Sequence, residues 1–188
     1  MTADYPEKKK RAAKELLEWG ISILLAIALA VGIHTWVGQL ITVDGPSMEP
    51  NLLTGERALV GKVEYWFHKP KRGDIVLVRY PGSRADFIKR VVAVAGEKVS
   101  IVDGKTLIDG KTLDEPYVQY PPFAEMEPVT VPEGSIFVMG DNRANSTDSR
   151  DPVVGPIPLD HVVGRAYLLV WPLSSAVKLT DYSGKLEQ

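Results

Sequence analysis

The sequence predicts an all-β domain, built of antiparallel coiled sheets in a barrel-like arrangement, that follows a single amino-terminal transmembrane helix. Residues 21–40, ISILLAIALAVGIHTWVGQL, contain no Asp, Glu, Lys or Arg. After residue 41, short runs rich in β-branched residues alternate with glycine and proline, and helical periodicity is nearly absent. We therefore expect a basic tail at 1–15, a transmembrane helix at 16–40 and a β domain at 41–188.

The apolar run is long enough to cross a bilayer, because twenty residues of α-helix span about 30 Å. Lys8, Lys9, Lys10, Arg11 and Lys14 precede it, whereas Arg57 is the one basic residue among the twenty that follow Leu40. The positive-inside rule then places the amino terminus in the cytoplasm and the β domain across the membrane. A cleavable export signal is the alternative, but the run is longer than the apolar core of most such signals and no small-x-small site follows it.

Seven segments of the second part have the alternation and composition of strands. Asp103-Gly104 joins two of them and is typical of a tight hairpin turn, because both residues tolerate positive φ angles. Residues 100–132 combine this hairpin with a stretch that has little periodicity, and we expect them to form a smaller β-hairpin insertion between two core strands. The predicted strands are 57–62, 74–80, 87–95, 98–102, 106–108, 134–139 and 161–171.

Composition argues against several kinds of chemistry. With no cysteine and only His34, His68 and His161, the chain offers no plausible set of metal ligands, so we expect no metal. A glycine-rich phosphate loop is missing, and we expect no cofactor. The 22 basic and 24 acidic residues give a formal net charge of −2, which does not favour nucleic acid as a partner.

The segment from Val43 to Leu52 is the first candidate for chemistry. Gly45, Pro46 and Pro50 restrict the backbone around Ser47 and hold a small hydroxyl in a defined place. On its own the pattern also fits an ordinary turn.

The second candidate is the apolar strand that contains Lys89 and Arg90. Adjacent residues of a strand point to opposite faces, and both faces are otherwise apolar here, so at least one cation is expected in an apolar environment. Burial lowers the pKa of a lysine, which can then act as a neutral base, whereas an arginine stays charged. The alternative is that Lys89 extends along the sheet and reaches water at its rim.

The third candidate is the polar run at residues 140–150, which follows an apolar strand. Such a run is ordinarily a surface loop with Asx turns. Its hydroxyls and its opposite charges would also suit the surroundings of a base.

Together these segments resemble type I signal peptidases, membrane-anchored serine proteases that remove signal peptides from exported preproteins. The resemblance covers most of the chain, and it is carried by the order and spacing of the motifs. These are Ser47-Met48-Glu49-Pro50, Arg72-Gly73-Asp74-Ile75-Val76, Lys89-Arg90-Val91, Gly96-Glu97, Gly140-Asp141-Asn142 and Asp148-Ser149-Arg150.

The resemblance implies a Ser-Lys dyad, in which Ser47 is the nucleophile and Lys89 the general base. Ser146 would hydrogen-bond the lysine amine, and Asp148 and Arg150 would form an ion pair behind it. The oxyanion would be held by the N–H groups of Ser47 and Gly45. Pro46 has no N–H, and position 45 lacks the serine that some members carry there.

Substrate contacts follow from the same resemblance. Val43, Met48, Leu52 and Ile88 would line the first subsite, and Ile41 would contribute to the second. The signal peptide would bind in an extended form along the strand edge at Asp86, Phe87 and Ile88.

The resemblance also implies where the protein works and with what. The expected partners are preprotein signal peptides and membrane lipid, and the expected location is a plasma or thylakoid membrane. Two alternatives are a related self-cleaving Ser-Lys repressor protease and a membrane-tethered β module without enzyme activity. The charge-free run argues against the soluble repressor.

Overall fold

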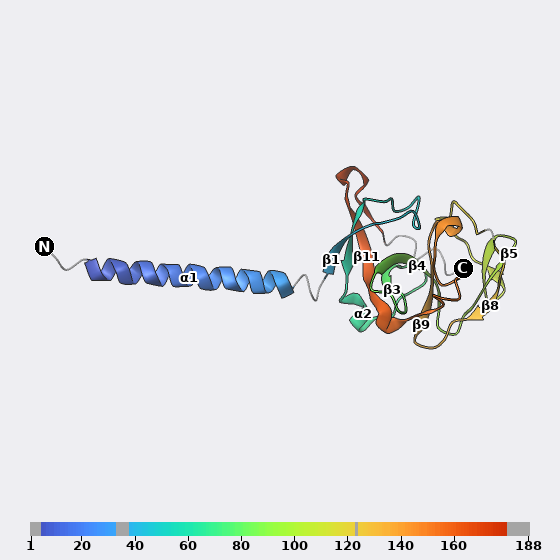
Figure 1. Ribbon diagram of the computed structural model, residues 1–188, viewed down its shortest axis with the longest axis horizontal. Coiled ribbons are helices and arrows are strands. Elements are labelled where there is room, and N and C mark those ends of the chain that lie inside the picture. Colours follow the sequence, from blue (N-terminus) through green and yellow to red (C-terminus); the bar gives the residue numbers. More distant parts are fainter. Residues whose placement is uncertain (1–4, 33–37, 123, 180–188) are drawn as a thin grey trace. The chain divides into compact units, whose positions relative to one another are not determined.

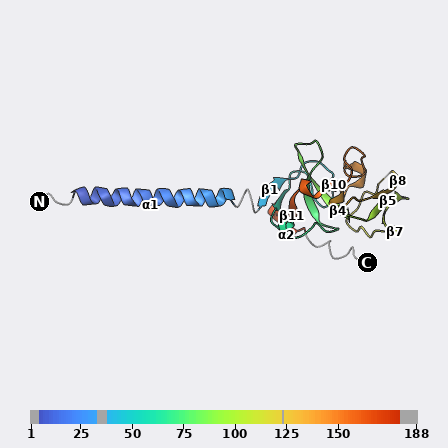
Figure 2. The ribbon, with the colours of Figure 1, turned by 90° about the horizontal axis from the view of Figure 1, so that it is seen from below.

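The computed structural model describes residues 5–32, 38–122 and 124–179, and it separates into a helical unit and a β domain that starts at Gly38. Helix α1, Tyr5–Gly32, is continuous over 28 residues (Figures 1 and 2). Its residues Lys14–Gly32 have a mean hydropathy of 1.8, and they are long and apolar enough to cross a membrane.

The predicted helix at 16–40 is too long at its carboxyl end. Residues 38–40 belong to strand β1, Gly38–Thr42, while 33–37, which include His34 and Trp36, lie outside the described residues. An apolar run does not by itself separate helix from strand, and here pairing with a neighbouring strand satisfies the backbone of residues 38–42. At its other end α1 begins at Tyr5, so most of the predicted basic tail is helical.

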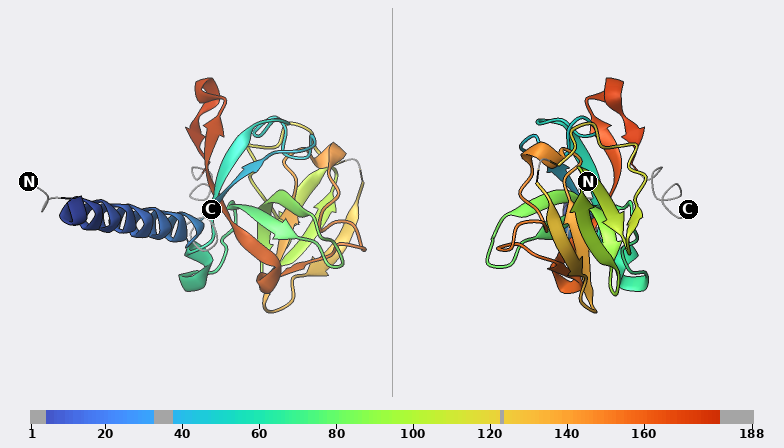
Figure 3. Two further views of the ribbon diagram at one scale, coloured as in Figure 1. Left: turned by 60° about the vertical axis from the view of Figure 1, so that its left-hand side comes forward. Right: turned by 90° about the vertical axis from the view of Figure 1, so that its right-hand side faces the viewer.

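The described part of the β domain contains a main sheet of eight antiparallel strands, in the order β1-β2-β11-β3-β4-β9-β10, with β12 paired to β11. Figure 3 shows that this sheet curls rather than lying flat. Its other strands are β2 (Arg57–Gly61), β3 (Ile75–Arg79), β4 (Asp86–Val94), β9 (Ser135–Met139), β10 (Ile157–Pro158), β11 (Val162–Trp171) and β12 (Val177–Lys178).

A smaller antiparallel sheet, in the order β7-β6-β5-β8, is inserted between β4 and β9, which are neighbours in the main sheet. It spans residues 98–130, close to the predicted insertion at 100–132. Asp103 and Gly104 join β5 to β6 with φ angles of 49° and 70°, as the turn chemistry predicts. The strands are β5 (Lys98–Val102), β6 (Lys105–Ile108), β7 (Lys111–Thr112) and β8 (Met126–Thr130).

Short helical turns complete the described part of the domain. One is the helix α2, Glu64–Phe67, and the others are 3₁₀ turns at Arg143–Asn145, Leu159–His161 and Leu173–Ser175. The architecture confirms the predicted fold class, a curled antiparallel β domain accompanied by one amino-terminal apolar helix.

Among the described residues, buried apolar side chains form three clusters. One lies under β1, β2, β3 and β11 and contains Met48, Leu52 and Leu77. A second lies between the two sheets and contains Val99 and Phe137. Figure 1 shows β5 and β8 beyond β9, on the side away from β1, which is where this second cluster joins the sheets.

We predict that Gly164→Ala destabilises the domain. A Cβ at Gly164 of β11 would lie 2.3 Å from the carbonyl oxygen of Gly61 and 2.9 Å from Cγ1 of Val60, and the backbone oxygen cannot move without disturbing the pairing of β2 and β11. Overpacking of this kind costs about 1–3 kcal/mol, which for a chain of this size lowers Tm by roughly 2–10 °C. Circular dichroism melting in detergent would measure the change. The exposed Lys111→Ala serves as control, and an unchanged Tm for Gly164→Ala would contradict the prediction.

Candidate active site

Ser47 and Lys89 meet at a pocket of about 300 Å³ in the main sheet. Ser47 lies in the turn after β1 and Lys89 lies on β4, and their side chains approach to 2.7 Å between Oγ and Nζ. This is hydrogen-bond distance, and it joins a hydroxyl to an amine across 42 residues of sequence. The pair is the arrangement that an activated serine nucleophile requires.

The loop that carries Ser47 is fixed at both ends. The N–H of Val43 donates to the carbonyl of Glu56 at 2.8 Å, and that of Gly55 donates to the carbonyl of Val43 at 2.9 Å. Between them, Met48 and Leu52 are fully buried and anchor the turn in the core. Both pack in the same core cluster as Val43, Leu77 and Ile88, which line the pocket, and their predicted part in the first subsite stays a prediction.

Lys89 is 3% exposed, and its burial lowers the pKa of the amine from 10.5 to about 8. The negative charges of Asp148 and Asp141 act in the opposite direction and limit the shift. The Lys89 side chain does not extend to water at the rim of the sheet, because it is buried and its Nζ contacts Oγ of Ser47. Lys89 can therefore exist as a neutral amine close to neutral pH.

Arg90, the next residue, is also fully buried but remains charged. Its Nε and Nη2 donate to the two carboxylate oxygens of Asp141, each at 2.7 Å, and its Nη1 donates to the carbonyl of Gly73 at 2.9 Å. Burial alone would lower the pKa of Arg90, but the charge and hydrogen bonds of Asp141 raise it above its ordinary value. Both adjacent cations are thus buried, each on a different face of β4.

The polar run at residues 140–150 packs against the nucleophile. Asn142 donates from its N–H to the carbonyl of Ser47 at 3.0 Å and from its side chain to the carbonyl of Pro46 at 3.2 Å. Gly140 lies so close that a Cβ there would be 2.4 Å from the Ser47 carbonyl oxygen and 2.3 Å from Oγ of Ser146. The run is therefore a packed wall of the site rather than a surface loop.

Asp148 and Arg150 form an ion pair in this wall. Arg150 donates through Nε and Nη2 to the two oxygens of Asp148, both at 2.8 Å, and Gly140 N–H adds a bond of 2.9 Å. Burial would raise the pKa of Asp148, but Arg150, the Gly140 amide and nearby Ser146 together lower it. The carboxylate therefore stays ionised, and its negative charge raises the pKa of Lys89.

Ser146 does not make the hydrogen bond to Lys89 that the resemblance implies. Its Oγ is buried, and within the described residues it has no hydrogen-bond partner that meets normal geometry, Lys89 included. It lies beside Gly140 and close to Asp148. The hydrogen bond from Ser146 to the lysine amine thus stays a prediction.

The pocket gathers five of the residues that were predicted to bind substrate, namely Ile41, Val43, Asp86, Phe87 and Ile88. Four further lining residues, Gln39, Thr42, Asp44 and Leu77, were not predicted. Gln39 and Thr42 belong to β1, which the apolar run concealed. Leu77 lies directly opposite Ile88 in the pairing of β3 with β4, so a correct strand register would have found it.

Two strand edges face this pocket. Among the described strands, Asp86–Lys89 of β4 pairs only with β3, because β9 begins its pairing at Arg90. In the same part of the chain, β1 pairs only with β2. An extended peptide could therefore add to the sheet beside Lys89.

The backbone amides at the nucleophile are placed to bind a ligand. Within the described residues, the N–H groups of Gly45 and Ser47 donate to no backbone or side-chain oxygen. Gly45 has a φ of +87°, a conformation that residues with a side chain rarely adopt. This turn can therefore direct amides toward a ligand beside Oγ of Ser47.

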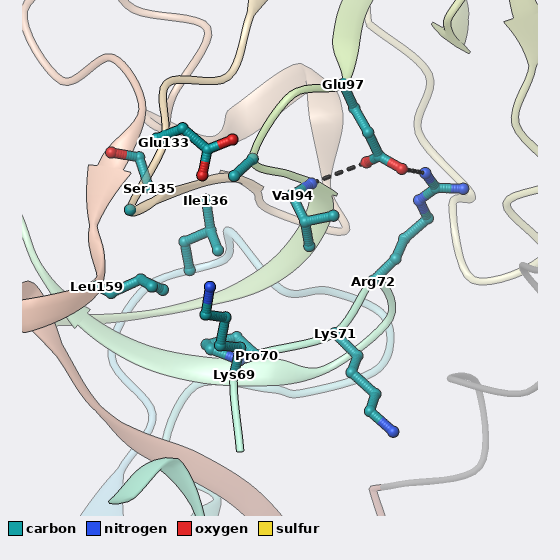
Figure 4. A pocket seen from close by; sticks show the side chains of 12 residues that line it. Lys69, Pro70, Lys71, Arg72, Val94, Glu97, Glu133, Ser135, Ile136 and Leu159 are labelled. Atoms are coloured by element: carbon teal, nitrogen blue, oxygen red, sulfur yellow. Dashed lines mark hydrogen bonds and ion pairs between the residues drawn. The ribbon is translucent and has the colours of Figure 1, made fainter. Parts of the chain in front are cut away.

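A larger pocket of about 670 Å³ lies elsewhere in the domain and contains neither Ser47 nor Lys89. Figure 4 shows the ion pair of Arg72 with Glu97 on its wall, with Glu97 also accepting from the N–H of Val94. Among the described residues that line it, no hydrogen bond joins the Ser135 hydroxyl to a lysine amine. The smaller pocket is therefore the better candidate for catalysis.

The two described histidines do not form a triad with Ser47. Neither His68 nor His161 lines its pocket. The Nδ1 of His161 lies 3.0 Å from the carbonyl oxygen of Arg79, and His68 is exposed at the end of α2.

We predict that Lys89→Met stabilises the folded protein near neutral pH. At any pH below about 8 the folded state bears the full penalty of burying this amine, and 2.5 pKa units correspond to about 3 kcal/mol. Between pH 8 and 10.5 the unfolded chain holds a proton that the folded chain lacks, so wild-type stability rises with pH there. The free energies of unfolding of wild type and Lys89→Met are measured with denaturant at pH 6.5 and 10. The variant should be more stable by up to about 3 kcal/mol at pH 6.5, and the difference should be smaller at pH 10. A less stable variant at pH 6.5 would show that the amine is not destabilising where it lies.

Comparison with known proteins gives a consistent result. The family model for "Signal peptidase, peptidase S26" matches residues 16–171. Signal peptidase I of Leptolyngbya laminosa is 37% identical over 172 residues, covering 87% of this chain and 84% of that protein. Signal peptidase I T of Bacillus subtilis is 36% identical over 175 residues, covering 88% and 90%. The probable thylakoidal processing peptidase 2 of Arabidopsis thaliana is 38% identical over 157 residues, covering 79% of this chain and 42% of that protein. Since the family model matches residues 16–171 and the two bacterial signal peptidases match over most of both chains, the chain belongs to the signal peptidase family, peptidase S26.

Proposed function

We propose that this membrane-anchored serine endopeptidase cleaves preproteins after small-x-small motifs through an acyl-enzyme on Ser47, with Lys89 as the general base. The observation that carries the proposal is the 2.7 Å contact between Oγ of Ser47 and Nζ of a lysine whose pKa burial lowers to about 8. A hydroxyl beside a neutral amine can lose its proton as it attacks a carbonyl carbon.

The steps follow from this geometry. Lys89 takes the proton of Ser47 as Oγ bonds to the scissile carbonyl carbon, and the N–H groups of Ser47 and Gly45 receive the oxyanion. The C–N bond then breaks, and Lys89 returns the proton to the leaving amine. Water, deprotonated by Lys89, hydrolyses the resulting ester and releases Ser47.

Substrate selection fits the shape of the smaller pocket. About 300 Å³ lined by Ile41, Val43, Leu77 and Ile88 accommodates small apolar side chains beside Ser47. The residues before the cut would pair with the open edge of β4 at Asp86–Ile88, with their side chains alternating between this pocket and solvent. Preprotein signal peptides, which end in small residues at the first and third positions before the cut, have this form.

Asp148 and Arg150 adjust the pKa of the base, Lys89. The ionised Asp148 raises the pKa of Lys89 and thereby limits the effect of burial, while Arg150 lowers it. Ser146 is proposed to orient the amine when substrate is bound. In that role it would complete the nucleophile, base and orienting group of an activated serine.

The proposed location is a plasma or thylakoid membrane, with the amino terminus in the cytoplasm, or in the stroma of a plastid, and the β domain on the opposite side. Membrane lipid is a proposed partner of the β domain as well as of the anchor. Leu40, Leu59 and Leu168 lie opposite one another on β1, β2 and β11 and are 51%, 38% and 38% exposed. Such a row suits contact with an apolar surface.

We predict that Ser47→Ala and Lys89→Ala each abolish cleavage, because either change removes the nucleophile or its base. The loss should be at least about 10³-fold in kcat. The test uses the full chain, purified in detergent, and a preprotein whose signal peptide ends in Ala-x-Ala, with products identified by mass spectrometry. His68→Ala and His161→Ala are the matched controls and should retain activity. Cleavage that survives both dyad substitutions would exclude this mechanism.

We also predict the pH dependence. Since only neutral Lys89 can accept the proton, kcat/KM should rise about tenfold per pH unit below pH 8 and level off above it. Asp148→Asn removes a negative charge that raises the pKa of Lys89, so its rising limb should move to lower pH. Initial rates from pH 5.5 to 10 would measure both profiles, and a midpoint near that of free lysine in the wild type would be incompatible with the proposal.

A further inference from the structure

Glu115, a residue of the smaller sheet's return segment, is bound into the wall of the active site. The return segment comprises residues 113–120, which lie between β7 and β8 of the smaller sheet. The side chain of Glu115 is 10% exposed, and it pairs with Arg143, whose side chain is fully buried. Arg143 lies three residues after Gly140, in the same polar run that packs against Ser47.

Arg143 has a complete and rigid set of partners. Its Nη2 donates to Oε1 of Glu115 at 2.5 Å, and its Nη1 donates to Oε2 of Glu115 and to Oγ1 of Thr106, each at 2.9 Å. Its Nε donates to the carbonyl of Gly140 at 2.9 Å. A planar guanidinium bound on both sides in this way is held in one position. The location of Gly140 therefore depends on the residues of the smaller sheet that bind Arg143.

Gly140 and Asn142 in turn contact the backbone of the nucleophile, Ser47. Asn142 is hydrogen-bonded to the carbonyls of Ser47 and Pro46, and Gly140 lies in close contact with the Ser47 carbonyl. Gly140 N–H also holds Asp148, the carboxylate that acts on Lys89. The chain of contacts therefore runs from Glu115 through Arg143 to the backbone of Ser47.

The same return segment makes a second set of contacts. The ring of Tyr117 lies 4.1 Å from the guanidinium carbon of Arg90. The carbonyl of Tyr117 accepts a hydrogen bond from the side chain of Asn51, which also donates to Asp141 at 2.9 Å. The carbonyl of Tyr120 accepts from the N–H of Arg143 at 3.1 Å. These bonds join the segment both to the nucleophile loop, through Asn51, and to the polar run.

We propose that Glu115 is a positioning residue for catalysis, which acts through Arg143 to hold the backbone of Ser47 in place. The smaller sheet is thereby part of the catalytic apparatus and not only an insertion. The inference rests on the proposed roles of Ser47 and Lys89. Because a displacement of about 1 Å can lower a rate by about 10²-fold, loss of this bond should reduce kcat.

The test compares Glu115→Gln, Glu115→Ala and wild type as full-length protein in detergent, with the Ala-x-Ala preprotein as substrate. We expect kcat to fall by about 10- to 100-fold with KM within about threefold, because substrate contacts are untouched. The pH midpoint should stay at its wild-type value, since Glu115 is not among the charges that act on Lys89. All rates are measured at a temperature where circular dichroism shows each variant folded.

Glu64→Gln is the matched control. Glu64 also pairs with an arginine from another element, Arg165, at 2.7 Å, and neither residue lines the pocket of Ser47. Its kcat should stay within about twofold of wild type even if its Tm falls, in keeping with a purely structural ion pair. Adding Glu115→Gln to Arg143→Gln should lower kcat no further than Arg143→Gln alone, because the effect passes through Arg143.

The proposal is overturned if folded Glu115 variants keep wild-type kcat, or if their whole defect lies in KM. If both variants fail to fold, Thr106→Val decides, since it removes one partner of Arg143 with little change in volume. A kcat loss of threefold or more supports the proposal, and an unchanged kcat overturns it. Failure of the proposed function looks different, because cleavage by wild type would then be absent or would persist in Ser47→Ala.

Discussion

The proposed mechanism depends on burying one amine in a β-sheet, so that part of it is uncharged near neutral pH. Lys89 lies on β4 among apolar neighbours, with Val76 of β3 opposite it, and burial provides the main contribution to its low pKa. An amine held in this way is destabilising when it carries a proton, so the surrounding structure must be stable enough to tolerate it. The chain has no cysteine, and this stability must therefore come from the packing and pairing of the sheets.

The neighbouring Arg90 shows how the sheet treats two buried cations differently. Arg90 receives a bidentate carboxylate and a carbonyl, and it stays charged. Lys89 has no carboxylate within hydrogen-bond distance among the described residues, and its one hydrogen-bond partner there is the hydroxyl of Ser47. The nearest negative charges, on Asp148 and Asp141, are each neutralised by an arginine of their own. Alternation along the strand thus separates a structural ion pair on one face from a reactive amine on the other.

Much of this arrangement was predictable from the sequence, because it depends on local patterns. Alternation and turn residues identified seven of the strands from Arg57 onward, but not β8 or the two-residue strands β7, β10 and β12. The motif resemblance identified Ser47 and Lys89, which the structure brings together. Strand β1 was missed because its residues continue an apolar run, and β8 because Pro128 and its glutamates weaken the strand pattern. For Met48 and Leu52, apolar character alone does not separate a residue of a pocket wall from a residue of the core, and both are fully buried. The pair of Glu115 and Arg143 joins residues 28 apart through tertiary packing, which no local pattern encodes.

The turn at Ser47 explains why so much of the domain converges on the backbone of one residue. Position 45 has no hydroxyl and Pro46 has no N–H, so in the proposed mechanism the oxyanion can be held only by backbone amides. A side-chain donor can adjust by rotation, whereas a backbone donor is only as well placed as its loop. Here the loop is held by the pairing of Val43 with Glu56 and Gly55, by buried Met48 and Leu52, and by Asn142. In the proposed mechanism the rigidity of this loop takes the place of a side-chain donor, so residues far from the reacting atoms are expected to influence the rate by determining where the two amides point.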